Sequence, residues 1–123
     1  MGNPYEILGK RDIFAMLNSV IPVISQALKK LLCAGAPLRK KTATEDLREA
    51  RNTLKRALKM HSAGLRYYPL LQSTPEQIDS DIELARLAFG GDVGIEAAKK
   101  VIDYATTGKR NHLVQALELL KDV

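Results

Sequence analysis

Apolar residues recur along the chain at the three- and four-residue spacing of amphipathic helices, and alternating β patterns are nearly absent. The first expected helix spans about Arg11 to Cys33, and its apolar side chains fill an arc wider than the stripe of an ordinary surface helix. Such a helix is either central to a bundle or shared with another subunit. Pro22 lies on its polar side and predicts a kink or a break there.

Capping residues and glycines predict four further helices. In chain order, the candidate N-caps are Thr44, Thr74, Asp92 and Asn111, and the corresponding ends are Tyr68, Gly90-Gly91, Thr107-Gly108 and a position close to Val123. The last three helices carry narrow apolar stripes and are joined by tight turns, which favours antiparallel packing of neighbours. The sequence therefore predicts an all-α fold: a compact bundle of about five helices, the first two long and the last three short.

Length and composition narrow the class of protein. The chain has 123 residues, 46% of them apolar, which predicts a single helical domain over residues 1–123 with a real core. One cysteine excludes an intramolecular disulfide and favours a reducing compartment. No charge-free run approaches the ~18 residues that a spanning helix needs, so we expect no membrane partner. A cytoplasmic protein, or one within an assembled particle, is the expectation.

Charge is distributed unevenly along the chain. The overall formal charge is +5, but residues 1–66 hold 13 Lys and Arg against 5 Asp and Glu, while residues 67–123 hold 6 against 9. The net charges are therefore +8 and −3. Such asymmetry indicates either attraction of the basic part to a polyanion or attachment of the basic part of one subunit to the acidic part of another.

One face of the second expected helix concentrates the positive charge. On a wheel of 100° per residue, five cations and a hydroxyl fall within about 80° of each other: Arg48, Arg51, Lys55, Lys59, Ser62 and Arg66. We expect this face to adjoin the buried arc and to be extended by a basic loop, Arg39-Lys40-Lys41. Lys and Arg side chains neutralise phosphates and release counterions, so these nine residues are the candidate nucleic-acid-binding site. A solvated face that only keeps the protein soluble is the other interpretation.

Catalytic and metal-binding patterns are missing from the sequence. There is no nucleophile–base pair, no metal-ligand spacing and no dinucleotide loop, so we expect no catalytic residues, no metal and no cofactor. His61 falls inside the apolar arc and is interpreted as a core histidine, and Cys33 as a buried small residue. Asp79, Asp81 and Glu83 are interpreted as a solvated helix face.

Two functions remain. The first is a non-enzymatic helical protein that binds nucleic-acid backbone, RNA or DNA, without sequence specificity, as a subunit that self-associates or joins a larger nucleoprotein complex through the apolar first helix. The alternative is a protein–protein interaction module, such as an adaptor, inhibitor or chaperone, that uses the basic stripe or the apolar first helix to bind a protein partner.

Overall fold

A computed structural model of the chain describes residues 6–7, 11–12, 22–36, 40–64, 74–89 and 91–123. Over these residues the chain is almost entirely helical: α2 (Pro22–Cys33), α3 (Ala43–Ser62), α4 (Pro75–Phe89), α5 (Asp92–Thr107) and α6 (Arg110–Leu119). Two short strands, β1 (Glu6–Ile7) and β2 (Arg11–Asp12), pair antiparallel with Glu6 opposite Asp12. The predicted all-α helical class is confirmed.

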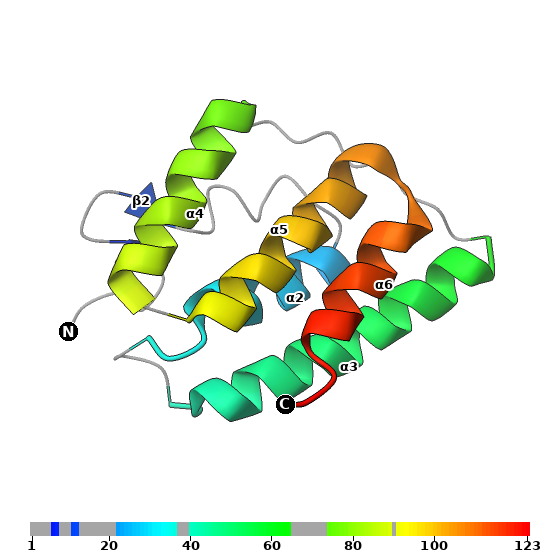
Figure 1. Cartoon of the computed structure of the whole chain (residues 1–123), viewed down its shortest axis with the longest axis horizontal. Coiled ribbons are helices and arrows are strands. Elements are labelled where there is room, and N and C mark those ends of the chain that lie inside the picture. The colour runs from blue at the N-terminus through cyan, green and yellow to red at the C-terminus, as the bar shows by residue number, and fades with distance from the viewer. Residues whose placement is uncertain (1–5, 8–10, 13–21, 37–39, 65–73, 90) are drawn as a thin grey trace.

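Helix α2 lies at the centre of the described helices. It packs against α3, α4 and α5, while α6 packs against α5 and α3 (Figure 1). Six of its apolar side chains are at most 1% exposed: Ile24, Ala27, Leu28, Leu31, Leu32 and Cys33. The expected apolar first helix is therefore covered within the chain over its described length, and Cys33 is buried as predicted.

The predicted start of this helix is wrong. Arg11 and Asp12 belong to β2, and α2 begins at Pro22, where a proline lacks only an N–H that the first turn leaves unbonded in any case. Helix α2 thus begins at the residue where the sequence predicts a kink or a break, and positions 13–21 lie outside the described residues. At 12 residues α2 is shorter than α4 (15) and α5 (16), so among the described helices only α3, with 20, fits the expected two long helices.

Helix ends agree with the sequence at some boundaries and differ at others. Thr74 caps α4 as predicted, because its hydroxyl accepts from the backbone N–H of Gln77 at 3.1 Å. Gly108 ends α5 in the left-handed conformation that glycine adopts at low cost (φ 72°). Helix α3 is capped by Thr42 instead of Thr44, since Thr42 accepts from the N–H of Glu45 at 3.1 Å.

The remaining differences concern α3, α5 and α6. Helix α3 ends at Ser62 and the chain turns at Gly64 with φ of 88°, so the predicted extension to Tyr68 is wrong. The N-cap of α5 is Gly91, and Asp92 is its first helical residue. The N-cap of α6 is Lys109 instead of Asn111, and the helix ends at Leu119, short of Val123. In none of the described segments is a helix both long and apolar enough to cross a membrane.

Candidate nucleic-acid interface

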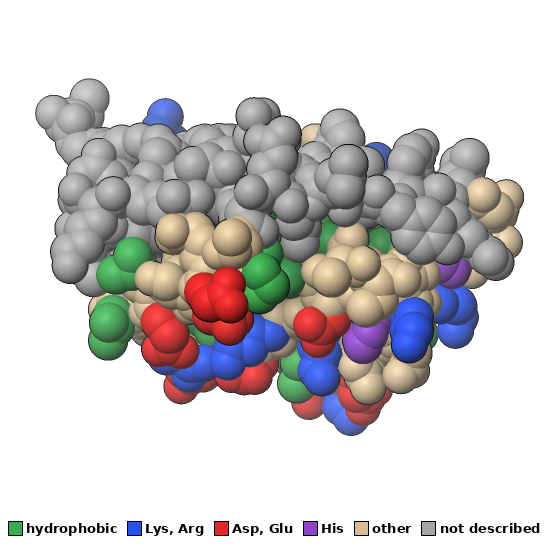
Figure 2. Space-filling model, turned by 90° about the horizontal axis from the view of Figure 1, so that it is seen from above, with side chains coloured by type: hydrophobic (Ala, Val, Ile, Leu, Met, Phe, Trp, Pro, Cys, Tyr) green, Lys and Arg blue, Asp and Glu red, His purple; other side chains and the backbone are tan. Residues whose placement is uncertain are grey.

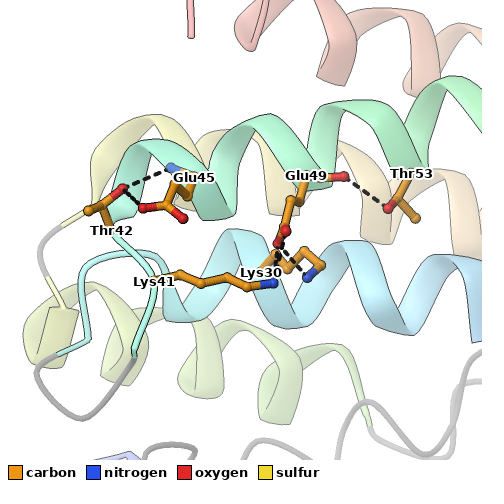
Figure 3. A network of polar contacts seen from close by, with 6 residues as sticks. All are labelled: Lys30, Lys41, Thr42, Glu45, Glu49 and Thr53. Atoms are coloured by element: carbon orange, nitrogen blue, oxygen red, sulfur yellow. Dashed lines mark hydrogen bonds and ion pairs between the residues drawn. The ribbon is translucent and has the colours of Figure 1, made fainter.

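Helix α3 runs along one edge of the molecule, seen at the bottom of Figure 1, with α2 and α6 packed on its inner side. At its first turn the Thr42 hydroxyl accepts from the backbone N–H of Glu45 and donates to the carboxylate of Glu45, each at 3.1 Å (Figure 3). Its buried side chains lie on one side of the helix: Asp46, Ala50, Leu54, Ala57 and His61. This buried side determines which cations face solvent.

Most of the predicted basic stripe faces solvent. Arg48, Lys55, Lys59 and Ser62 are exposed on the side of α3 that lies opposite the buried side chains. The expectation that the stripe adjoins the buried arc is therefore wrong for these residues. The reason is that Leu47 and Leu58 are only half-buried, whereas Asp46 and His61 are buried, which rotates the buried arc away from the cations.

Arg51 is the stripe residue that does adjoin the core. It is half-buried, and its Nη1 donates a hydrogen bond to the carbonyl oxygen of Val123 at 2.5 Å. Its guanidinium is thus committed to the last residues of the chain that follow α6. The structure separates Arg51 from the exposed cations of the predicted site.

The predicted basic loop is only partly available. Lys40 is exposed, but the Nζ of Lys41 lies 2.6 Å from Glu49 Oε2, and Lys30 reaches the same carboxylate at 2.8 Å (Figure 3). Hydrogen bonds from Lys30 and Lys41 lower the pKa of Glu49 to about 2, and the bond to Glu49 raises the pKa of Lys41. Lys41 is therefore held in an ion pair within the chain, and it shares the single carboxylate of Glu49 with Lys30. Arg39 and Arg66 lie outside the described residues.

Arg56 belongs to the exposed cations although the predicted site omitted it. It is exposed one position after Lys55 and extends the charged surface sideways from the Arg48–Lys55–Lys59 line. The signal was present in the sequence, since no Asp or Glu occurs from residue 50 to residue 75. We define the basic face of α3 as Arg48, Lys55, Arg56 and Lys59. Among the described residues, none of these four forms an ion pair.

Buried polar residues elsewhere in the helices have structural partners. His61 is 6% exposed, and its Nδ1 lies 2.8 Å from the hydroxyl of Tyr104 on α5, which confirms the interpretation of His61 as a core histidine. Asp81 was expected on a solvated face, but it is 2% exposed and accepts from Gln77 Nε2 at 2.9 Å. Its neighbours Asp79 and Glu83 do face solvent as expected.

Among the described residues, no group of three or more His, Cys, Asp or Glu side chains is placed so that it could hold a metal ion. Gly94, in the first turn of α5, has a packing role, because it lies directly against the backbone carbonyl of Leu31 on α2. A side chain at position 94 would overlap that carbonyl.

Comparison of the chain with protein-family models, with curated proteins and with solved structures found no match in any of the three.

Proposed function

We propose that this protein is a non-enzymatic helical protein that binds nucleic-acid backbone without sequence specificity through the basic face of α3. The observation that carries the proposal is the set of four exposed cations, Arg48, Lys55, Arg56 and Lys59, which form no ion pair among the described residues. Elsewhere several cations are paired with nearby acids, as Lys41 is with Glu49 and Arg86 with Glu96 at 3.0 Å.

The spacing of the basic face suits an extended polyanion. Helical rise places Arg48 and Lys59 about 16 Å apart along the axis, with Lys55 between them. Like charges at this spacing repel each other by a few tenths of a kcal/mol per pair in the free protein. Phosphates relieve that repulsion and release their condensed counterions to solvent, which drives binding.

The basic face favours backbone contact over base reading. Long, flexible Lys and Arg side chains on a solvent-facing helix reach phosphates from many positions, and such contacts carry no sequence information. Ser62 at the end of the face and Lys40 before it add one neutral donor and one further charge. We place the protein in the cytoplasm or in an assembled particle, where nucleic acid is accessible.

An acidic protein surface is the second candidate partner, because it would meet the same four cations. The apolar first helix does not support this alternative over its described length, since its apolar side chains from Ile24 to Cys33 are buried within the chain. Self-association through that helix lacks support for the same reason.

The test is a fluorescence-anisotropy titration of single- and double-stranded oligonucleotides over a salt series. Four phosphate contacts predict a slope of log K against log salt of about −3 for a single strand and about −3.5 for a duplex. The variant Lys55→Glu/Lys59→Glu should bind at least about tenfold more weakly at about 50 mM salt.

The matched control is Lys109→Glu/Arg110→Glu, which changes the formal charge equally at two exposed cations beside the start of α6. It should bind nearly as the unaltered protein does. Equal losses of affinity in both variants would show that binding depends on net charge alone, and this would contradict the basic face of α3 as the binding site. Absence of binding by the unaltered protein at low salt would overturn the function, and binding to an acidic peptide alone would support the second candidate.

A further inference from the structure

Helix α4 presents an acidic counterpart to the basic face of α3. Glu76, Asp79 and Glu83 are exposed and follow one side of the helix at spacings of three and four residues. We define these three residues as the acidic face of α4. Among the described residues Glu76 and Asp79 form no ion pair, and Glu83 has one long contact, 3.5 Å to Arg86. The strongly exposed Leu87 (73%) continues the same side one turn later.

A pocket of about 270 Å³ lies beside this acidic face, between α4 and α5. Its floor is apolar and buried, made of Ile78, Ile82 and Ile102. Asp79 and Asp103 stand at its rim together with Glu96, Lys99 and Lys100. Glu96 contacts both Arg86 at 3.0 Å and Lys99 at 3.4 Å, whereas Asp79 and Asp103 form no ion pair among the described residues. Lys100 adds a positive charge to the same rim, so a lysine from outside would have to displace it from the two aspartates.

The chemistry of this pocket fits a lysine side chain. A lysine stem packs along apolar surface while its ammonium group remains with charged or hydrated partners. Here the isoleucine floor would take the stem, and Asp79 and Asp103 would take the ammonium. The basic face of α3 supplies two such lysines, Lys55 and Lys59, that have no acid to pair with among the described residues.

The two faces lie on different sides of the molecule. In Figure 1, α4 is at the top, α3 is at the bottom and α5 lies between them, so one chain does not close the contact on itself. Figure 2 views the molecule from the α4 side and shows several acidic side chains exposed there, with Lys and Arg among them. Among the described residues, the basic face of α3 has no ion pair and the acidic face of α4 has only the long Glu83–Arg86 contact, so the two faces are complementary between copies.

We propose that a second copy of this chain occupies the acidic face of α4, with the basic face of its α3 laid along Glu76, Asp79 and Glu83 and a lysine inserted in the pocket. Arg48 and Lys55 are seven residues apart, as are Glu76 and Glu83, so two helices packed side by side place charges of opposite sign opposite each other. The contact is heterologous: each copy uses a different surface, so association continues from copy to copy.

This inference goes beyond the proposed function, and it makes self-association and nucleic-acid binding compete for the same four cations. Both are weakened by salt, because exposed charges are screened over about 10 Å at 0.1 M ionic strength. They differ in their dependence on α4, which only self-association needs.

The experiment measures the weight-average mass by light scattering at about 20 mM and about 500 mM salt. At low salt and high protein concentration the mass should be at least about twice the 13.6 kDa of one chain, and it should return to 13.6 kDa at high salt. Asp79→Lys/Glu83→Lys alone and Lys55→Glu/Lys59→Glu alone should each be monomeric, because each leaves two faces of like charge. Mixed in equal amounts, the two variants should associate again.

Several outcomes overturn the inference. These are a monomeric unaltered protein at low salt, undiminished association of the Asp79→Lys/Glu83→Lys variant, or a mixture of the two variants that stays monomeric. The control Lys109→Glu/Arg110→Glu should associate as the unaltered protein does. A monomeric control would show that association depends on net charge alone.

Oligonucleotide binding separates this inference from the proposed function. The Asp79→Lys/Glu83→Lys variant should retain oligonucleotide binding while losing self-association. An unaltered protein that binds oligonucleotide but stays monomeric refutes only the inference, and one that associates through α4 but ignores oligonucleotide refutes only the function. If both hold, oligonucleotide should lower the mass of the associated protein.

Discussion

The guanidinium of Arg51 donates to the carbonyl oxygen of Val123, 72 residues later in the chain, at 2.5 Å. This bond ties the middle of α3 to the residues that follow α6. It also divides a series of cations that look equivalent in sequence: Arg51 bonds within the fold, while Arg48, Lys55, Arg56 and Lys59 are exposed and form no ion pair among the described residues.

Arg51→Met should therefore lower stability more than it lowers oligonucleotide affinity. Loss of the hydrogen bond predicts a decrease of about 1 kcal/mol in the free energy of unfolding. Arg48→Met is the control, since Arg48 is exposed and should lose affinity with little change in stability. Urea unfolding and anisotropy on both variants check this, and the reverse ranking would contradict the division.

Glu49 should make the stability of the protein depend on acid pH. Its folded-state pKa of about 2 lies below its ordinary value of 4.5, so its contribution is fully present above pH 4.5 and disappears as the pH falls through about 2. Glu49→Gln should be less stable than the unaltered protein near neutral pH, and the difference should vanish near pH 2.

The check is urea unfolding of both proteins between neutral pH and about pH 2. The Lys41→Gln variant should lose less stability between neutral pH and about pH 2 than the unaltered protein does. Some loss should remain, because Lys30 still contacts the Glu49 carboxylate at 2.8 Å. A constant difference between Glu49→Gln and the unaltered protein across this range would contradict the lowered pKa.

Thr42 and Thr44 provide a direct test of where α3 begins. Thr42→Ala removes the hydroxyl that accepts from the Glu45 N–H and should cost about 1 kcal/mol of stability. Thr44→Ala, inside the first turn, should cost nothing, because alanine has the higher helix propensity. Thermal unfolding distinguishes them, and a larger loss at position 44 would place the cap there.

Gly94→Ala should destabilise the protein although alanine favours helices. A Cβ at this position meets the carbonyl of Leu31, and because that atom is backbone, α2 and α5 would have to move apart. Overpacking of this kind costs about 1–3 kcal/mol, which exceeds the gain of about 1 kcal/mol from replacing a helical glycine. A rise in the melting temperature would show that the two helices are not held so closely.

Tyr104→Phe should remove the hydroxyl that lies 2.8 Å from His61 Nδ1 between α3 and α5. Because the pair is buried, we expect a loss of about 1–2 kcal/mol. A double-mutant cycle with His61→Phe isolates the pairwise contribution from the other contacts of each residue. A coupling energy near zero would mean that the two side chains only pack together.

The helical class, the α4 cap at Thr74, the α5 end at Gly108 and the burial of Cys33 and His61 could be predicted from sequence. Each depends on neighbouring residues: apolar spacing, a capping hydroxyl or a glycine with positive φ. The wrong boundaries have local causes too, since Thr42 and Thr44 offer the same hydroxyl two residues apart. Only Thr42 is followed three residues later by a glutamate, Glu45, which is the spacing of a capping box, so the sequence already distinguishes the two threonines.

The availability of the cations was decided by tertiary structure. The sequence alone determined that positive charge is concentrated around α3 and that no acid follows Glu49 until Glu76. It could not show that Glu49 pairs with Lys41, that Val123 accepts from Arg51, or that the remaining cations lie opposite the buried side. Charge is a property of each residue, whereas the pairing of charges depends on distances between segments far apart in the chain, which only the packed helices bring together.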